Sequence, residues 1–229
     1  MIVAIHQPQY LPWLGYFDKM SKADVFCYLD NVQYKKNEWQ NRNRIKIAQG
    51  RQWITVPVRY RFPQKINEVE INNSVKWKKK HIQAFITNYS KASYFNNYIS
   101  YFEDFFSENW LLLSDLNVFL IERLRDFLDL QSKPTVLASR LTLRDDPTDR
   151  LVDICKAVGA DTYLSGQDGI KYMDLKRFEE TGIKVITQEF NHPVYPQLYH
   201  EFQSHLSIVD LLFNCGPESM DKIREVNPL

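Results

Sequence analysis

The amino-terminal stretch of residues 2–30 decides the fold, and it reads IVAIHQPQYLPWLGYFDKMSKADVFCYLD. Its first four residues are apolar and three of them are β-branched, which favours a buried strand. A polar turn follows, because Pro8 lacks the N–H that would continue the strand. Leu14, Phe17 and Met20 then have helical spacing, and a second apolar run ends the stretch. The stretch therefore predicts a strand, a loop, a helix and a second strand.

The rest of the chain continues this alternation, above all in its last third. Further strands are expected at residues 53–58, 68–71, 135–138, 162–164 and 183–187. Further helices are expected at about residues 74–89, capped by Ser74, and at 94–106, 110–130, 147–158, 173–180, 207–213 and from 217 onward. Strand–helix alternation at both ends predicts an α/β fold with a mainly parallel, Rossmann-like sheet. We expect a single domain of residues 1–229, in which residues 74–133 form a helical insertion or cap.

The amino-acid composition limits the classes of function that the chain can have. The chain has 229 residues, 44% of them hydrophobic, so it can bury a full core. Its formal net charge of +1 argues against a protein that coats nucleic acid or an anionic membrane. The three cysteines, Cys27, Cys155 and Cys215, are scattered and odd in number, which is typical of reduced thiols in the cytoplasm. No zinc-site spacing, signal peptide or long apolar span is visible, so we expect a cytoplasmic protein without a metal. The oligomeric state stays open, with a homodimer as one alternative.

Four polar segments follow the ends of expected strands. They cover residues 5–16, 30–44, 165–172 and 190–197. In an open parallel sheet, ligands bind beyond the carboxyl ends of the strands. We therefore expect the four segments to meet at one edge of the sheet and to form a single site.

Arg42 and Arg44 are the candidates for binding an anion. They alternate around Asn43, so their side chains point the same way if the segment is extended. A pair of guanidinium groups can hold a phosphate or a carboxylate through paired hydrogen bonds. The alternative is a solvated basic patch, which would include Lys35 and Lys36.

His6 and His192 are the candidate catalytic residues. His6 directly follows the first strand, and His192 lies in the last polar segment. An imidazole with an ordinary pKa near ~6.5 can act as a general base. The alternative for each is a histidine whose ring is satisfied by a backbone carbonyl. His81, His200 and His205 are expected on helix faces.

Polar groups and aromatic rings of the same segments complete the predicted substrate site. Asp30 and Gln33 flank a turn, where they can orient a polar substrate or simply act as an Asp cap and a solvent-facing amide. Aromatic rings can stack on a base or a sugar, although such rings more often belong to a core. Gly15 interrupts a helix, which indicates the close approach of a neighbouring strand or of a ligand. The other candidate substrate-binding residues are Gln7, Tyr10, Trp13, Tyr16, Tyr34, Asn43, Ser165, Gly166, Tyr195 and Gln197.

These motifs together resemble the WbqC-like protein family. The resemblance covers essentially the whole chain and is carried by residues 6–8, 12–17, 30–34, 41–45, 163–166 and 206–214. Members of this bacterial family are often encoded with genes for O-antigen and other surface polysaccharides. The resemblance implies a role in making or modifying activated sugars, as in lipopolysaccharide biosynthesis.

The opening of the chain is also similar in layout to the nucleotidylyltransferase superfamily, which includes pantothenate synthetase. That superfamily carries a His-x-Gly-His signature at a helix start after the first strand. Here Trp13-Leu14-Gly15-Tyr16 takes its place, so the glycine matches and both histidines are replaced. Gln33 and Tyr34 lie where pantothenate synthetase has a substrate-binding Gln followed by Phe. Because the replaced histidines contact nucleotide phosphates, the resemblance leaves the use of ATP open.

The resemblance and the basic, polar segments together predict an amide-forming enzyme. It would transfer an acyl or aminoacyl group, from an activated donor or with ATP, to the amine of a nucleotide-linked amino sugar. Arg42 and Arg44 would hold the anionic group, and His6 or His192 would take a proton from the attacking amine. One alternative is a non-catalytic module that binds sugar nucleotides or assembles other proteins. Binding of nucleic acid through the basic patch is another, and the balanced charge opposes it.

Overall fold

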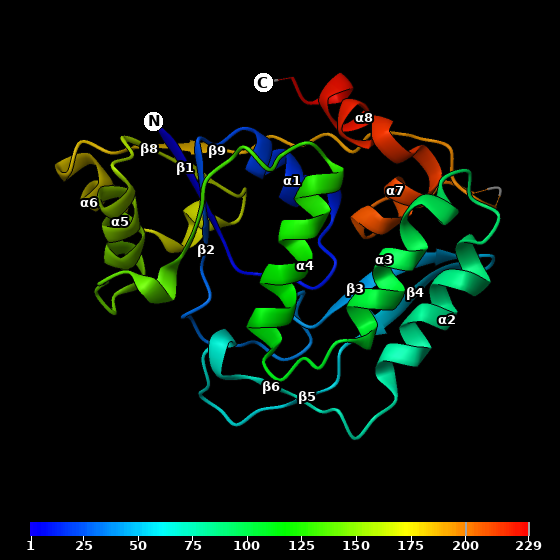
Figure 1. The fold of residues 1–229 in the computed structure, drawn as a ribbon. Helices are drawn as coiled ribbons and strands as arrows, with labels where there is room; N and C mark the ends of the chain where they lie inside the picture. The colour runs from blue at the N-terminus through cyan, green and yellow to red at the C-terminus, as the bar shows by residue number, and fades with distance from the viewer. Residues whose placement is uncertain (200, 229) are drawn as a thin grey trace.

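A five-stranded parallel sheet forms the centre of the computed structural model, which describes residues 1–199 and 201–228 (Figure 1). The strand order is β7-β2-β1-β8-β9, and all four neighbouring pairs are parallel. The strands are β1 (Ile2–His6), β2 (Val25–Tyr28), β7 (Thr135–Leu137), β8 (Thr162–Ser165) and β9 (Lys184–Thr187). The expected α/β fold with a parallel sheet is therefore confirmed.

The direction of chain progression reverses at β1, the central strand. Val3 lies opposite Val25 of β2 on one side and opposite Tyr163 of β8 on the other. From β1 the chain builds the sheet outward through β2 and β7, and later outward in the other direction through β8 and β9. Such a reversal leaves a crevice beyond the carboxyl ends of the two central strands.

Both faces of β1 are buried against helices. Successive side chains of a strand point to opposite faces, and here Val3 and Ile5 belong to one apolar cluster while Ala4 belongs to another. The helices that flank the sheet are α1 (Leu14–Ser21), α5 (Pro147–Val158) and α6 (Leu175–Glu180). The cluster of Val3 includes residues of α5 and α6, and the cluster of Ala4 includes residues of α1. A strand covered on both sides requires the near-continuous apolar run seen at the start of the sequence.

A group of helices with an aromatic core extends the α1 side of the sheet (Figure 1). These helices are α2 (Trp77–Tyr89), α3 (Phe95–Ser107), α4 (Leu113–Phe127), α7 (Ile208–Cys215) and α8 (Ser219–Val226). Phe85, Phe102 and Phe213 meet at their centre, with ring centroids 5.2–5.8 Å apart. Ser74 does not cap α2 as expected: its hydroxyl donates to Asn72 Oδ1 at 2.7 Å, and the helix begins three residues later.

Two antiparallel hairpins lie outside the central sheet. They are β3 (Arg42–Ile47) with β4 (Gly50–Thr55), and β5 (Val58–Arg59) with β6 (Glu70–Ile71). The single strand expected at residues 53–58 is therefore wrong, because the chain leaves strand geometry at Val56 and Pro57. His205, expected on a helix face, lies in a loop with a φ of +59°, and His200 lies outside the described residues.

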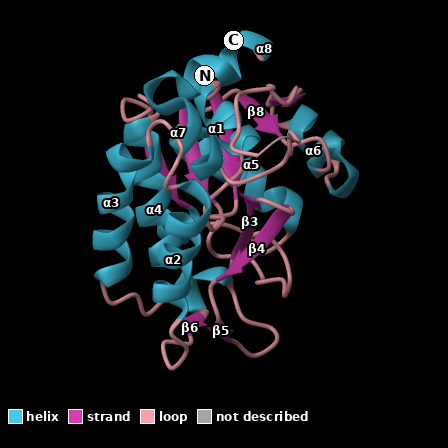
Figure 2. Cartoon of the chain, turned by 90° about the vertical axis from the view of Figure 1, so that its right-hand side faces the viewer, coloured by secondary structure: helices cyan, strands magenta, loops and turns pink. Residues whose placement is uncertain are grey.

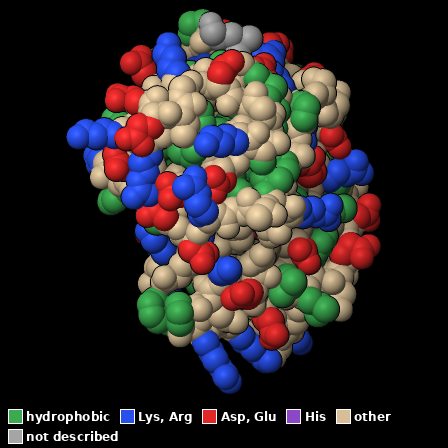
Figure 3. Space-filling view, turned by 90° about the vertical axis from the view of Figure 1, so that its left-hand side faces the viewer, with side chains coloured by type: hydrophobic (Ala, Val, Ile, Leu, Met, Phe, Trp, Pro, Cys, Tyr) green, Lys and Arg blue, Asp and Glu red, His purple; other side chains and the backbone are tan. Residues whose placement is uncertain are grey.

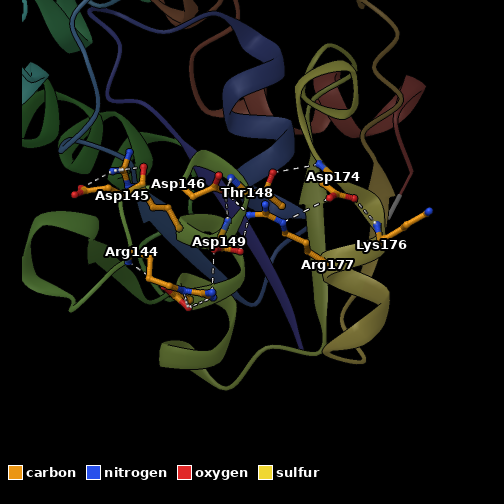
Figure 4. Close-up of polar contacts among 10 residues, drawn as sticks. Arg144, Asp145, Asp146, Thr148, Asp149, Asp174, Lys176 and Arg177 are labelled. Carbon is orange, nitrogen blue, oxygen red and sulfur yellow. Dashed lines mark hydrogen bonds and ion pairs between the residues drawn. The ribbon is translucent and has the colours of Figure 1, made fainter.

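The start of α5 follows the sequence signal and is tied to α6 by charged side chains. Asp146 Oδ1 accepts hydrogen bonds from the backbone N–H groups of Thr148 at 2.9 Å and Asp149 at 3.0 Å. Arg177 of α6 reaches back to Asp146 at 2.7 Å and to Asp149 at 3.0 Å (Figure 4). Acidic and basic side chains are interspersed over this side of the molecule (Figure 3). Because exposed ion pairs contribute little to stability, their main effect is to orient α6 against α5.

The irregular segments of residues 188–199 and 201–206 are held by the buried carboxylate of Asp210. Asp210 is fully buried, and it accepts hydrogen bonds from the hydroxyls of Tyr89 and Tyr195 and from Gln197 Nε2, each at 2.8 Å. Burial raises the pKa of Asp210 to about 6 in spite of these three donors. The segment that crosses the end of the sheet is thus fixed at Tyr195 and Gln197.

Removal of the Asp210 carboxylate would leave three donors without their acceptor. Asp210→Ala is expected to lower the free energy of unfolding by about 3 kcal/mol or more, whereas Tyr195→Phe, which removes one donor, should cost about 1 kcal/mol. Urea unfolding followed by circular dichroism measures both. Equal losses in the two variants would contradict the anchoring role of Asp210.

Candidate functional site

A cavity of about 640 Å³ lies beyond the carboxyl ends of β1, β8 and β9. This is the crevice that the reversal at β1 produces. Residues 5–7 and Trp13 line it from the first strand and its loop, and residues 165–169 line it from the loop after β8. The segment after β9 closes it with residues 190–192, together with the more distant His205.

Six of the residues predicted from the sequence line this cavity. They are His6, Gln7, Trp13, Ser165, Gly166 and His192. The polar segments that follow β1, β8 and β9 therefore meet at one edge of the sheet. The segment of residues 30–44, which follows β2, does not take part in the lining. The sequence predicts four converging segments, and the cavity combines parts of three of them.

Lys19 also lines the cavity, although the sequence does not predict it as a site residue. Its side chain is almost fully buried, and Nζ donates a hydrogen bond to the carbonyl oxygen of Ile5 at 2.9 Å. An ammonium group has three donors, yet within the described part of the chain no carboxylate lies within 4.0 Å of Nζ. Burial lowers the pKa of Lys19 to about 7. An amine with this pKa can accept a proton at neutral pH.

His6 lies next to Lys19 and is held in its neutral form. Burial and the positive charge of Lys19 lower the pKa of His6 to about 3. Nδ1 is 3.2 Å from the carbonyl oxygen of Gln7. Because a carbonyl only accepts, Nδ1 carries the proton and Nε2 is left as an acceptor. His6 is therefore suited to accept a hydrogen bond from a substrate and is a weak base.

His192 is held at both ring nitrogens by the backbone. Nδ1 donates to the carbonyl oxygen of Pro193 at 2.9 Å, and Nε2 accepts from the N–H of His205 at 3.0 Å. Burial and the neighbouring His205 lower the pKa of His192. This geometry favours the structural alternative for His192, because neither nitrogen is free for a substrate.

Trp13 forms the wall of the cavity and explains the glycine at position 15. A Cβ atom on Gly15 would lie 2.2–2.6 Å from carbons of the Trp13 indole. The close protein neighbour of Gly15 is thus the Trp13 indole and not a neighbouring strand. The indole also stacks on the His205 ring at 6.1 Å and meets Phe190 edge-on at 5.0 Å.

The remaining candidates lie outside the lining, and most have partners of their own. Tyr10 binds His81 Nδ1 at 2.8 Å, and Asp30 accepts from the backbone N–H of Ser139 at 2.9 Å, so both side chains have partners within the protein. Gln33 is exposed. The others contact other protein groups: Tyr16 donates to Gln7 O, Tyr34 packs on Tyr60, Asn43 donates to Leu11 O, and Tyr195 and Gln197 bind Asp210.

Arg42 and Arg44 point the same way, as their spacing predicts, but they do so on the hairpin and not in the cavity. Both guanidinium groups stack on the indole of Trp53. Neither arginine belongs to the lining of the cavity. Any anion that they hold is bound at a second place on the molecule.

Residues 1–199 and 201–228 contain neither a cluster of metal ligands nor a membrane-spanning helix. No group of three or more His, Cys, Asp or Glu side chains there is placed to hold a metal ion. No helix within these ranges combines the length and apolar character needed to cross a bilayer.

Comparison with known proteins identifies the family. The model of the WbqC-like protein family matches residues 7–222. The chain belongs to this family. It is also 39% identical over 228 residues to the uncharacterized protein Rv1507c of Mycobacterium tuberculosis, a match that covers 97% of each chain. No solved structure matches it significantly. The matched range includes every cavity residue of this WbqC-like protein except Ile5 and His6.

The contact between Gly15 and Trp13 reverses the usual effect of a helix substitution. Gly15→Ala alone is expected to destabilise the protein by about 1–3 kcal/mol, because the indole must move. In a Trp13→Ala background the same change should stabilise by about 0.5–1 kcal/mol, the ordinary gain of alanine over glycine in a helix. Urea unfolding of the four proteins tests this, and the same sign in both backgrounds would refute it.

Proposed function

We propose that this WbqC-like protein is an enzyme of surface-polysaccharide sugar biosynthesis that forms an amide. It transfers an acyl or aminoacyl group to the amine of a nucleotide-linked amino sugar. Membership of the family supports the sugar pathway. The observation that carries the chemistry is the buried Lys19 amine in a cavity beyond the carboxyl ends of β1 and β8.

Amide formation requires a base beside the attacking nitrogen. In the proposed step the sugar nitrogen attacks the carbonyl carbon of the activated acyl group and forms a C–N bond. The bond from that carbon to the leaving group breaks, and one proton of the nitrogen passes to Lys19 Nζ. Lys19 then returns this proton to the leaving group. His6 Nε2 accepts a hydrogen bond from the same amine and orients it for attack.

The donor is either an acyl group that is already activated or a carboxylate that ATP activates. The cavity itself contains Lys19 as its cation and no arginine among its lining residues. We place the reaction in the cytoplasm, in keeping with three buried cysteines that are free thiols.

The second candidate function is a module that binds a sugar nucleotide without catalysis. It is favoured by His192, whose two ring nitrogens are both engaged by the backbone. The two functions make different demands on Lys19. A binding module needs only the shape of the cavity, whereas the proposed enzyme needs a titratable amine in it.

Mass spectrometry tests the activity directly. Nucleotide-linked amino sugars are incubated with the protein and with ATP plus amino acids, or with CoA thioesters, and an added acyl mass is expected in the sugar product. Lys19→Met should lower the rate by about 10²-fold or more, the usual contribution of a general base. Lys79→Met, which alters an exposed lysine of α2, is the matched control. Product formation at the wild-type rate by Lys19→Met would rule out the proposed base.

The lowered pKa of Lys19 also predicts two pH dependences. The rate should rise as pH increases through about 7, because Lys19 loses its proton there. Lys19 holds its proton less tightly in the folded protein than in the unfolded chain, so the free energy of unfolding should rise with pH above this value. Lys19→Met should be more stable than the wild type at pH 6, with the gap closing toward pH 10. A gap that does not change with pH would contradict the shift.

A further inference from the structure

The hairpin of β3 and β4 carries a cluster of two arginines and two tryptophans. Arg42 Cζ lies 4.2 Å from the centre of the Trp53 ring, and Arg44 Cζ lies 5.0 Å from Trp53 and 5.1 Å from Trp39. The two indoles are 5.3 Å apart. We call Trp39, Arg42, Arg44 and Trp53 the arginine–tryptophan face. In Figure 2 no helix lies in front of this hairpin.

The alternation of the strand fixes which side chains form this face. Asn43 and Ile45 are buried, and Asn43 donates to the carbonyl oxygen of Leu11 at 2.6 Å. Arg42 and Arg44 therefore point away from the core. Trp53 stands directly opposite Arg44 in the hairpin register, and its ring lies within 5.0 Å of both guanidinium groups.

The positive charge of the face has no acidic partner in the described part of the chain. Neither Arg42 nor Arg44 forms an ion pair with any carboxylate of residues 1–199 and 201–228, including Glu38 of the preceding loop. The Arg42 guanidinium donates a hydrogen bond to the carbonyl oxygen of Asn37. Burial and the positive charges of Arg51 and Arg42 lower the pKa of Arg44. Stacking on indoles holds the arginines in place but does not neutralise their charge.

Like charges that are held together without a counter-charge destabilise a protein. A bound anion removes this repulsion. Guanidinium groups bind phosphate through paired hydrogen bonds, and an indole offers a flat surface for a planar ring. Trp53 is 42% exposed, so part of its ring is free to contact a ligand.

We propose that the arginine–tryptophan face binds a nucleoside diphosphate, with its phosphates on Arg42 and Arg44 and its base against Trp53. This deepens the proposed function, because the face then holds the nucleotide part of the nucleotide-linked sugar. Binding of the free nucleotide does not depend on the amide-forming reaction.

Backbone hydrogen bonds fix the face to the wall of the cavity. The N–H of Ser207 donates to the carbonyl oxygen of Arg44 at 2.9 Å, and Ser207 also forms a β-bridge with Trp13. The N–H of Tyr10 donates to the carbonyl oxygen of Trp39 at 3.1 Å. The segments that carry the cavity residues Trp13 and His205 are thus the segments that support the face.

Isothermal titration with uridine diphosphate tests the proposal. The wild type is expected to bind it, and binding should weaken as salt screens the phosphates. Arg44→Gln and Arg42→Gln should each weaken binding by about tenfold or more, as expected for the loss of a charge-assisted contact. Arg59→Gln, at an exposed arginine of the neighbouring β5, is the matched control and should bind like the wild type. Thermal unfolding checks that each variant is folded.

Three further arms separate the outcomes. Lys19→Met should bind uridine diphosphate like the wild type, so loss of the reaction and loss of this site are distinguishable. Inorganic pyrophosphate should bind the wild type more weakly than uridine diphosphate does, because it lacks a base. The Trp53→Leu variant should bind uridine diphosphate more weakly than the wild type does. The proposal is overturned if the wild type does not bind the nucleotide, if the double variant at Arg42 and Arg44 binds it unchanged, or if a single-stranded oligonucleotide binds far more tightly.

Discussion

The hydrogen bond from Lys19 Nζ to the carbonyl of Ile5 joins the first helix to the end of the central strand, and the candidate site is arranged around it. A parallel sheet that reverses its chain order at β1 must leave its central carboxyl ends uncovered by crossover helices. The short helix α1 follows the loop after β1, and its residue Lys19 lines this crevice. Because the surroundings are buried, the amine is favoured in its neutral form. The neighbouring His6 is kept neutral by the same burial and by the same lysine.

Much of the fold could be predicted because the sheet strands are apolar runs bounded by Pro, Gly and polar turns. The helix start at Pro147 and its stop at Gly159, which has a φ of +73°, follow local rules that tertiary packing does not disturb. The hairpin strand β3 was harder to recognise, since basic residues occupy every second position of its sequence RNRIKI and it has no apolar run. The expected cap at Ser74 failed because α2 begins only at Trp77, with Lys76 at the N-cap position, so Ser74 lies too far ahead of the first turn.

The position of the site at the end of the sheet could be predicted from the sequence, but not all of the residues that line it could. Polar segments after parallel strands must converge, and three of the four did. Lys19 could not be found this way, because an amphipathic pattern assumes that polar residues of a helix face solvent, whereas every residue of α1 is buried. Gly15 one turn earlier was the available signal, since positions four apart share a face of a helix. The Trp13 indole, which lines the cavity, packs against Gly15.

The cavity and the arginine–tryptophan face divide the chemical requirements of the proposed reaction. The cavity offers the Lys19 amine as a base and His6 Nε2 as an acceptor, and no arginine lines it. The hairpin offers positive charge and aromatic rings outside that cavity. The most direct test of the account is the titration of the Lys19 amine in the folded protein, followed by NMR of the lysine side-chain carbons and assigned by comparison with Lys19→Met. The account predicts a midpoint of about 7. A midpoint near ~10.4, the value of a lysine in water, would contradict it.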